Sequence, residues 1–274
     1  MRTIAFLNNR SGDGKTALVY HLAWMFAELG RRVVAADLDT QSQLSGMFLG
    51  EARLEELWPD GDHSSTIQAA LERNAQPHIE EITREIGLIV GDLGLSNFED
   101  LPTDAVRVAM QAASEKWSAD LVLVDAGPGL GYLNRSVLAA VDAVVIPIAA
   151  DVFSAQALRA LGHRLRVSTN CRPIGYVLMQ PALRRAGRSW SDRIPGEYRR
   201  AVLDEDAVGP GALDDPNCLG SLKRYQSLMP MATEAHKPMF HLKPADGAIG
   251  AHGEAVRDCH AEFKRLAMRI LTAM

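Results

Sequence analysis

The chain has 274 residues, 47% of them hydrophobic, and a formal net charge of −5. That length suits one large α/β domain, and the charge excludes a uniformly basic nucleic-acid protein while permitting a local basic patch. The three cysteines, Cys171, Cys218 and Cys259, show no metal-ligand spacing, which favours reduced thiols. No apolar run is long enough to span a bilayer and no signal peptide precedes the first apolar run, so we expect a cytoplasmic protein that does not use a membrane.

The first thirty residues predict a strand, a glycine-containing loop and a helix. Residues 3–7 form an apolar run rich in branched and aromatic side chains, and apolar residues recur at helical spacing over 17–29. The loop between them ends in Gly14-Lys15-Thr16. In this context the loop N–H groups and the helix N-terminus face an anion, the lysine neutralises phosphate charge, and the threonine hydroxyl can ligate Mg²⁺.

Strands and helices alternate along most of the remaining chain. Since nearly all the expected strands are uniformly apolar, we predict an α/β fold with a mostly parallel, doubly wound sheet and helices on both faces, as in P-loop NTPases. Residues 92–100 are expected to form a loop. The expected strands lie at 32–37, 88–91, 120–125, 143–148 and 174–179, and the expected helices at 66–71, 104–117, 154–167 and 254–274.

The stretch at about 182–223 interrupts this alternation. Arginines crowd its first half and acidic residues its second, so we predict a loop and a helix followed by an irregular insertion within a single domain spanning 1–274. Trp190 and Tyr198, which lie among the arginines, could stack on nucleic acid or pack the insertion.

Four segments, in their order along the chain, resemble the ParA/MinD type of P-loop ATPase. Residues 10–16, Arg-Ser-Gly-Asp-Gly-Lys-Thr, resemble the deviant Walker A loop of that family, whereas the strict P-loop pattern fails because Asn9 stands at its first glycine. Residues 37–41 resemble the Asp-x-Asp-Pro-Gln segment, and 124–128 resemble the Walker B and switch region. Residues 228–238 resemble the last-strand segment, where a proline lies near adenine. The resemblance covers almost the whole chain outside 182–223.

The resemblance implies an ATP- and Mg²⁺-dependent switch that dimerises and positions or segregates DNA or another cargo, with weak ATPase activity. It implies as partners a second copy of the chain, non-specific DNA and a ParB-like or cargo adaptor protein, and a location on the nucleoid if DNA is bound. A degenerate nucleotide-sensing regulator or scaffold with little hydrolysis is the alternative.

The resemblance also assigns roles to particular residues. The catalytic set is Asp39, which orients the attacking water, with Lys15 and Arg10. The metal set is Thr16 and, through water, Asp125, while Asp37 anchors the switch region. The nucleotide-binding set is Arg10, Ser11, Gly12, Asp13, Gly14, Lys15, Thr16, Ala17, Gln180 and Pro230.

Departures from the family pattern favour the degenerate alternative. Arg10 stands where the family has its signature lysine, which reaches the partner's phosphates; arginine keeps the charge with a different geometry. Ser11 replaces a glycine, and Asp13 brings a like charge that weakens phosphate binding unless it points outward or pairs with Arg10. Ala17 lacks a hydroxyl, and Thr40 and Gly127 replace prolines.

The charge pattern raises two possible surfaces, one for DNA and one for a membrane, and the membrane surface is not expected. A non-specific DNA surface would depend on phosphate neutralisation, although a solvated face is the simpler interpretation. The final helix, with Lys264, Arg265 and Arg269, could attach to a membrane as in MinD, but packing against the core is the stronger expectation. The arginines proposed for DNA are Arg184, Arg185, Arg188, Arg199 and Arg200.

Overall fold

The computed structural model describes most of the chain, and every structural statement below concerns that part. The described residues are 1–58, 64–73, 76–98, 102, 104–129, 131–167, 171–179, 185–205 and 215–274.

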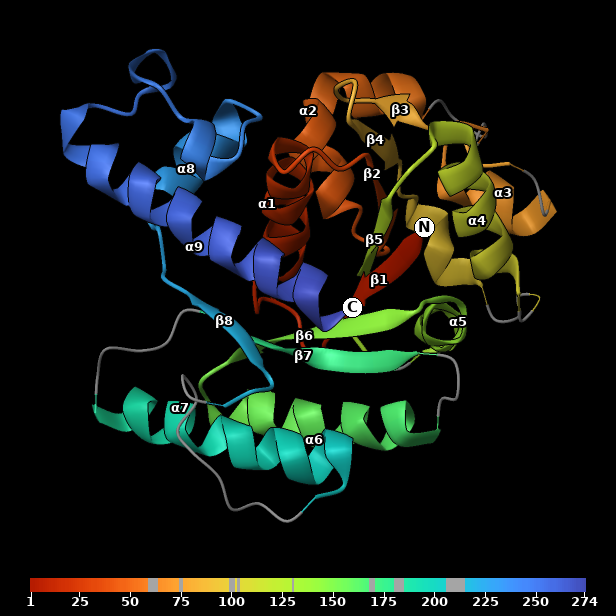
Figure 1. The fold of residues 1–274 in the computed structure, drawn as a ribbon. Helices are drawn as coiled ribbons and strands as arrows, with labels where there is room; N and C mark the ends of the chain where they lie inside the picture. The colour runs from red at the N-terminus through yellow and green to blue at the C-terminus, as the bar shows by residue number, and fades with distance from the viewer. Residues whose placement is uncertain are drawn as a thin grey trace. The chain divides into compact units, whose positions relative to one another are not determined.

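Within the described residues, the strands belong to one sheet (Figure 1). They are β1 Arg2–Phe6, β2 Val33–Leu38, β3 Glu80–Glu81, β4 Ile86–Ile89, β5 Leu121–Ala126, β6 Ala143–Ala149, β7 Arg172–Met179 and β8 Cys218–Leu222. Their order is β3-β4-β2-β5-β1-β6-β7-β8. The pairs β1–β5, β2–β5, β2–β4 and β7–β8 are parallel, and β3–β4 is antiparallel. The predicted mostly parallel sheet is confirmed.

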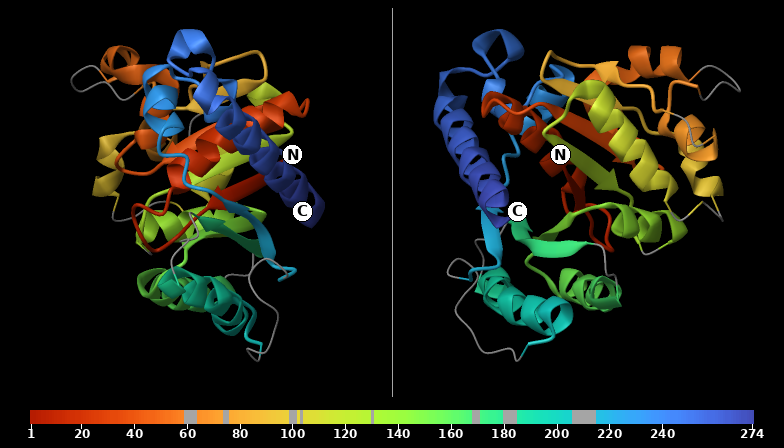
Figure 2. Two further views of the ribbon diagram at one scale, coloured as in Figure 1. Left: turned by 90° about the vertical axis from the view of Figure 1, so that its left-hand side faces the viewer. Right: turned by 45° about the vertical axis from the view of Figure 1, so that its right-hand side comes forward.

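The chain divides into two compact units, the first made mainly of Met1–Leu7 and Lys15–Val144. Every residue of β2 and β5 is buried, because these strands lie at the centre of the unit with helices over them. In both figures α1 covers one face of these strands and α4 the other (Figures 1 and 2). The helices are α1 Lys15–Glu28, α2 Gln43–Leu57, α3 Ile67–Arg73, the 3-10 turn η1 Leu93–Asn97, α4 Ala105–Trp117 and α5 Tyr132–Ala140.

The second unit contains Asn8–Gly14 and most of the chain from Val145 onward. In it α6 packs on α7 and on the π-helical turn η2, and α9 packs on β8 (Figure 1). The amphipathic α9 buries Phe263, Leu266, Ala267 and Ile270, as its spacing predicts. The elements are α6 Val152–Val167, α7 Arg185–Tyr198, η2 Arg199–Leu203, α8 Leu228–Glu234, the 3-10 turns η3 Met239–His241, η4 Pro244–Asp246 and η5 Gly250–His252, and α9 Gly253–Ala273. In the described part of the chain no helix is both long and apolar enough to cross a membrane.

Several elements differ from the sequence-based expectation. The segment 228–238 does not form the last strand: it begins with α8, whose first turn accommodates Pro230 because the N–H that proline lacks has no acceptor there. The last strand is instead β8, inside the stretch expected to be irregular. Helices α2 and α5 were not expected. A glycine at position 50 with φ of 74° interrupts α2, and two glycines weaken its helical pattern. The expected loop at 92–100 contains η1.

Candidate phosphate-binding site

The loop before α1 is held by contacts inside the second unit. Asn8 donates from Nδ2 to Asp13 Oδ2 at 2.6 Å and to the carbonyl of Pro147 in β6 at 2.7 Å. Gly12 and Gly14 have φ values of 84° and 77°, which only glycine adopts without cost. Ser11 is not among the described non-glycine residues with positive φ, so its replacement of a glycine causes no strain of this kind. The altered sequence therefore keeps glycine at the two described loop positions with a left-handed backbone.

Arg10 is engaged by carboxylates of its own chain. Its Nη1 lies 2.6 Å from Asp151 Oδ2, 3.0 Å from the hydroxyl of Ser154 and 3.4 Å from Asp13 Oδ1. The hydrogen bond to Asp151 raises the pKa of Arg10. Burial is the largest single influence on Asp151 and acts to raise its pKa, but the hydrogen bonds from Arg10 and Ser154 and the charge of Arg10 together lower it. The guanidinium also lies over the ring of Phe153, 5.6 Å from its centroid.

Asp13 points into this network. Its Oδ2 accepts a hydrogen bond from Ser154 Oγ at 3.1 Å in addition to the one from Asn8, and the residue is only 5% exposed. Burial raises the pKa of the Asp13 carboxyl, and the nearby Arg10 opposes that shift. Of the two conditions that the sequence left open for Asp13, pairing with Arg10 is the one found. The sequence analysis did not identify Asp151 and Ser154 as partners of Arg10 and Asp13. The sequence signal that could have indicated them is the helix-start pattern Asp151-x-x-Ser154, in which Ser154 N–H donates to Asp151 Oδ1 at 2.8 Å.

In the first unit, Lys15 opens α1 and lies between two of the predicted site carboxylates. Its Nζ is 3.6 Å from Asp39 Oδ2 and 4.0 Å from Asp125 Oδ1. All three residues are buried, with Lys15 7% and Asp39 6% exposed. Strands β2 and β5 are parallel neighbours, and Asp37 pairs with Asp125 in their register. The carboxyl ends of both strands therefore lie at the same edge of the sheet. The fold therefore assembles Lys15, Asp39 and Asp125, which the sequence predicted as a group.

Asp37 anchors the segment that carries Asp39. Its Oδ2 accepts from the N–H of Ser45 at 2.8 Å and from the Ser45 hydroxyl at 2.7 Å, and its Oδ1 accepts from the N–H of Asp39 at 3.2 Å. Burial raises the pKa of Asp37 to about 6, and the hydrogen bonds from Ser45 act against this shift. The two donors of Ser45 thus tie the end of β2 to the start of α2, and the N–H of Asp39 fixes the segment between them.

The turn after β5 has an anchor that the sequence analysis did not identify. Asn134, on α5, donates from Nδ2 to the carbonyls of Gly127 and Gly129 at 2.7 and 2.8 Å. A Cβ added at Gly127 would lie 3.5 Å from Asp39 Oδ1, which is ordinary van der Waals contact. The absence of proline at this position leaves space beside Asp39 without removing the support of the turn.

The buried carboxylate of Asp125 is suited to a cation. The side chain is fully buried, and no hydrogen bond of standard geometry reaches either of its oxygens within the described residues. Burial raises the pKa of Asp125 to about 8, Lys15 opposes this shift, and Thr16 lies close enough to favour the ionised form. Among described residues there is no group of three or more acidic, histidine or cysteine side chains that could enclose a metal. This donor set fits Mg²⁺, which takes one or two protein oxygens and completes its shell with water and phosphates.

The remaining predicted site residues are not all brought together. Gln180 and Arg184 lie outside the described residues, and of Arg185 and Arg188 only the backbone within α7 is described. Pro230 lies in α8 and Ala17 in the first turn of α1.

Arg199 does not belong to the expected DNA surface. It is 8% exposed and donates from Nη2 to Asp215 Oδ1 at 2.8 Å, so it is a buried structural cation. Tyr198 is fully buried with its ring 5.1 Å from that of Tyr176, which excludes it from stacking on nucleic acid. Arg200 is exposed and lies 3.6 Å from Glu197.

Comparison with known proteins adds family relationships to this geometry. The family model described as an AAA domain matches residues 1–171. The sporulation initiation inhibitor protein Soj of Bacillus subtilis is 29% identical over 174 residues, covering 61% of this chain and 65% of that protein. The cell division protein PomZ of Myxococcus xanthus is 28% identical over 160 residues, covering 57% of this chain and 49% of that protein.

The solved structures share the fold. The cell division ATPase MinD of Pyrococcus furiosus superposes with a TM-score of 0.70 at 16% identity, covering 100% of this chain and 99% of that one. The match to the two curated relatives covers between about half and two thirds of their own length.

Proposed function

This chain belongs to the AAA-domain family, as a P-loop ATPase of the ParA/MinD type, and from that membership we propose that it is an ATP-dependent switch that positions or segregates a cargo. The observation that carries the proposal is the placement of Lys15 at the start of α1 between Asp39 and Asp125. A buried ammonium at a helix N-terminus beside a loop with two left-handed glycines is a site for phosphate. The two carboxylates beside Lys15 can position a cation, at Asp125, and a water molecule, at Asp39.

In this proposal each residue has a distinct task. Lys15 exchanges its carboxylate partners for the β- and γ-phosphates of ATP, and the N–H groups of the loop and of the first turn of α1 bind phosphate oxygens. Thr16 directly and Asp125 through water would hold Mg²⁺, which supplies positive charge to the phosphates when bound. Asp39, held in place through Asp37, orients the attacking water. Because Asp39 acts on the attacking water, a contact made in the transition state, its contribution is expected in the rate of hydrolysis more than in ATP affinity.

A second function, a nucleotide-sensing regulator with little hydrolysis, is favoured by one observation. Arg10, at the place of the family's signature lysine, is bound to Asp151 at 2.6 Å and lies 3.4 Å from Asp13. To reach the phosphates of a second copy it must leave these partners, which makes any dimer-dependent hydrolysis slower. The two functions share nucleotide binding and differ in turnover.

Size-exclusion chromatography with ATP, with ADP and without nucleotide, combined with ATPase rates, tests these proposals. A shift to a dimer with ATP, accompanied by measurable hydrolysis, supports the switch. A dimer without hydrolysis supports the regulator. Lys15→Ala is the control and should abolish both effects; absence of ATP binding by the wild type, or binding unchanged in Lys15→Ala, contradicts the nucleotide site itself.

We further propose that DNA is a cargo or track, bound without sequence preference by the nucleotide-bound dimer. The surface would use Arg184, Arg185, Arg188 and Arg200, and its support is the arginine content of this stretch. Charge reversal at Arg185 and Arg188 should weaken binding to random duplexes and lower the slope of log affinity against log salt. Arg257→Glu, at an exposed arginine on α9, is the matched control. Equal binding by the two variants would place the DNA surface elsewhere. A ParB-like or other adaptor is the expected protein partner.

A further inference from the structure

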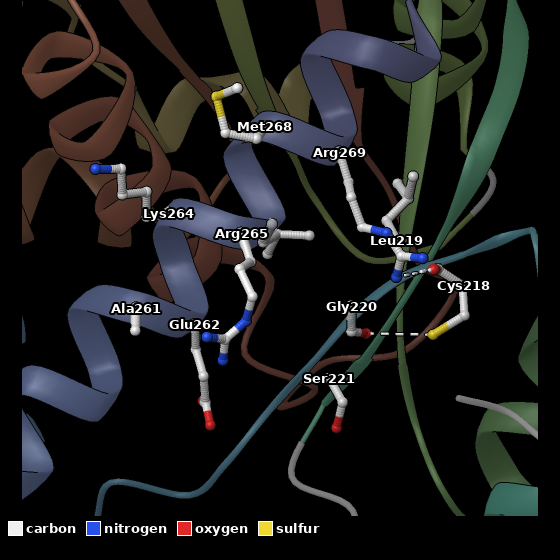
Figure 3. A pocket seen from close by; sticks show the side chains of 11 residues that line it. Cys218, Leu219, Gly220, Ser221, Ala261, Glu262, Lys264, Arg265, Met268 and Arg269 are labelled. Atoms are coloured by element: carbon white, nitrogen blue, oxygen red, sulfur yellow. Dashed lines mark hydrogen bonds between the residues drawn. The ribbon is translucent and has the colours of Figure 1, made fainter. Parts of the chain in front are cut away.

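A groove of about 730 Å³ lies between β8 and the C-terminal half of α9, away from the phosphate loop residues described above (Figure 3). This volume is within the range of about 300–1,000 Å³ that ligand pockets occupy. Its lining is mostly apolar, with Leu219 and Leu266 buried at its base and Met268 51% exposed. No role assigned above to nucleotide or DNA uses this groove.

Among the described strands, the one that forms this wall is the last in the sheet, and hydrogen bonds with α9 lie near both of its ends. Arg269 donates from Nη1 to the carbonyl of Cys218 at 3.1 Å, and Glu262 accepts from the N–H of Lys223 at 3.2 Å. Between these two contacts Gly220 and Ser221 line the groove. The absence of a side chain at Gly220 brings the strand close to α9, since a Cβ there would lie 3.3 Å from Leu266. The result is an open channel along an edge strand rather than a closed cavity.

The charge at this groove is positive. Arg265 and Arg269, one turn apart on α9, extend on the side that faces β8 (Figure 3). The single acid in the lining, Glu262, is already paired with Lys223, whose Nζ lies 3.4 Å from Oε1. From Phe263 to the last residue, Met274, the sequence contains three cations and no acid. Cations near a helix C-terminus also complement the helix dipole, but the dipole does not explain an apolar hollow beside them.

We propose that this groove binds an extended, acidic segment of a partner protein, with its apolar side chains against the exposed Met268 and its carboxylates on Arg265 and Arg269. Peptides recognised at edge strands gain specificity from alternate side chains that enter pockets. Arginine binds carboxylates in a bidentate manner, which fits a side chain that reaches over an apolar floor. The sugar–phosphate backbone of DNA has charge to offer but no apolar groups for the base of the groove, so a peptide is the better match.

The test uses the full-length chain and a fluorescein-labelled octapeptide that alternates glutamate and leucine. Fluorescence anisotropy should show binding, and Arg265→Glu should weaken it about tenfold or more. Arg257→Glu, the same charge change on an exposed face of the same helix outside the groove, should have no effect. Versions of the peptide with lysine for glutamate, or with serine for leucine, should bind at least about tenfold more weakly, because each lacks one half of the complementarity.

Several outcomes overturn the proposal. These are no binding at about 1 mM peptide, equal binding by Arg265→Glu and wild type, or equal binding of the lysine peptide. The proposal is also overturned if random-sequence duplex DNA binds through Arg265 while the acidic peptide does not bind, because the cations then form a nucleic-acid surface. Binding of an ATP analogue by Arg265→Glu shows that the variant is folded. Since the groove does not depend on nucleotide, a wild-type chain that binds the ATP analogue but not the peptide counts against this proposal alone.

Discussion

Replacing Asp13 by asparagine should tighten ATP binding. Asp13 places a carboxylate in the loop that is proposed to hold phosphates, and Arg10 only partly neutralises it. The two charges are 3.4 Å apart, and Arg10 has 35% of its side chain exposed. Coulomb's law gives about 5 kcal/mol for this distance at an effective dielectric constant of about 20 and about 1 kcal/mol in bulk water. Exposure of Arg10 puts the attraction near the lower value.

The repulsion that asparagine removes is of similar size. If the Asp13 carboxylate and a bound phosphate are taken to be roughly 7 Å apart, Coulomb's law at an effective dielectric constant of about 40 gives about 1 kcal/mol. One kcal/mol corresponds to about a fivefold change in the dissociation constant. Asparagine keeps the oxygen that accepts from Asn8 and from Ser154, so the loop retains those two hydrogen bonds. We therefore expect Asp13→Asn to bind an ATP analogue about five- to tenfold more tightly at low salt.

Calorimetric titration with Mg²⁺ and a slowly hydrolysed ATP analogue measures this effect at low and high salt. The gain should shrink at high salt, because screening weakens the repulsion. Ser154→Ala removes one hydrogen bond to Asp13 without changing charge, and its affinity should stay within about twofold of wild type. Unchanged or weaker affinity in Asp13→Asn would refute the reasoning, and would mean that the loop needs the negative charge to hold Arg10.

Four further predictions address residues at or near the other carboxylates. Asp39→Ala should lower the ATPase rate at least about tenfold with little change in analogue affinity, measured by steady-state kinetics and calorimetry; loss of binding instead would mean that its role is wrongly assigned. Gly127→Ala, which adds only an ordinary contact beside Asp39, should be active. Asp37→Ala leaves three donors unpaired and should lower the free energy of unfolding by about 3 kcal/mol in urea titrations, with a change below about 1 kcal/mol arguing against the anchor role. Arg199→Ala should destabilise by about 3 kcal/mol because Asp215 stays buried without its partner, and DNA binding weakened without any loss of stability would contradict this.

The sequence by itself determined the features that depend on neighbouring residues. The apolar runs predicted six of the eight strands found in the described residues, because a strand buried on both faces must be apolar along its length. The sequence Gly14-Lys15-Thr16 between a strand and a helical pattern predicted the loop that precedes α1. The family resemblance assigned site roles to Lys15, Asp39 and Asp125, and the structure brings these three side chains together.

Only the tertiary structure decided which charges are paired and which elements continue the sheet. Arg10 pairs with Asp151, which is 141 residues away in the sequence. Arg199 pairs with Asp215 and is therefore not part of the expected DNA surface. In the sequence these arginines resemble Arg200, which is exposed. The strand β8 was hidden in a polar stretch, because an edge strand needs fewer apolar residues than a central one and its partner β7 lies far away in sequence. The hydrophobic pattern of a short segment reflects which of its side chains are buried. The partner of a charged side chain or of an edge strand depends instead on residues that are distant in the sequence.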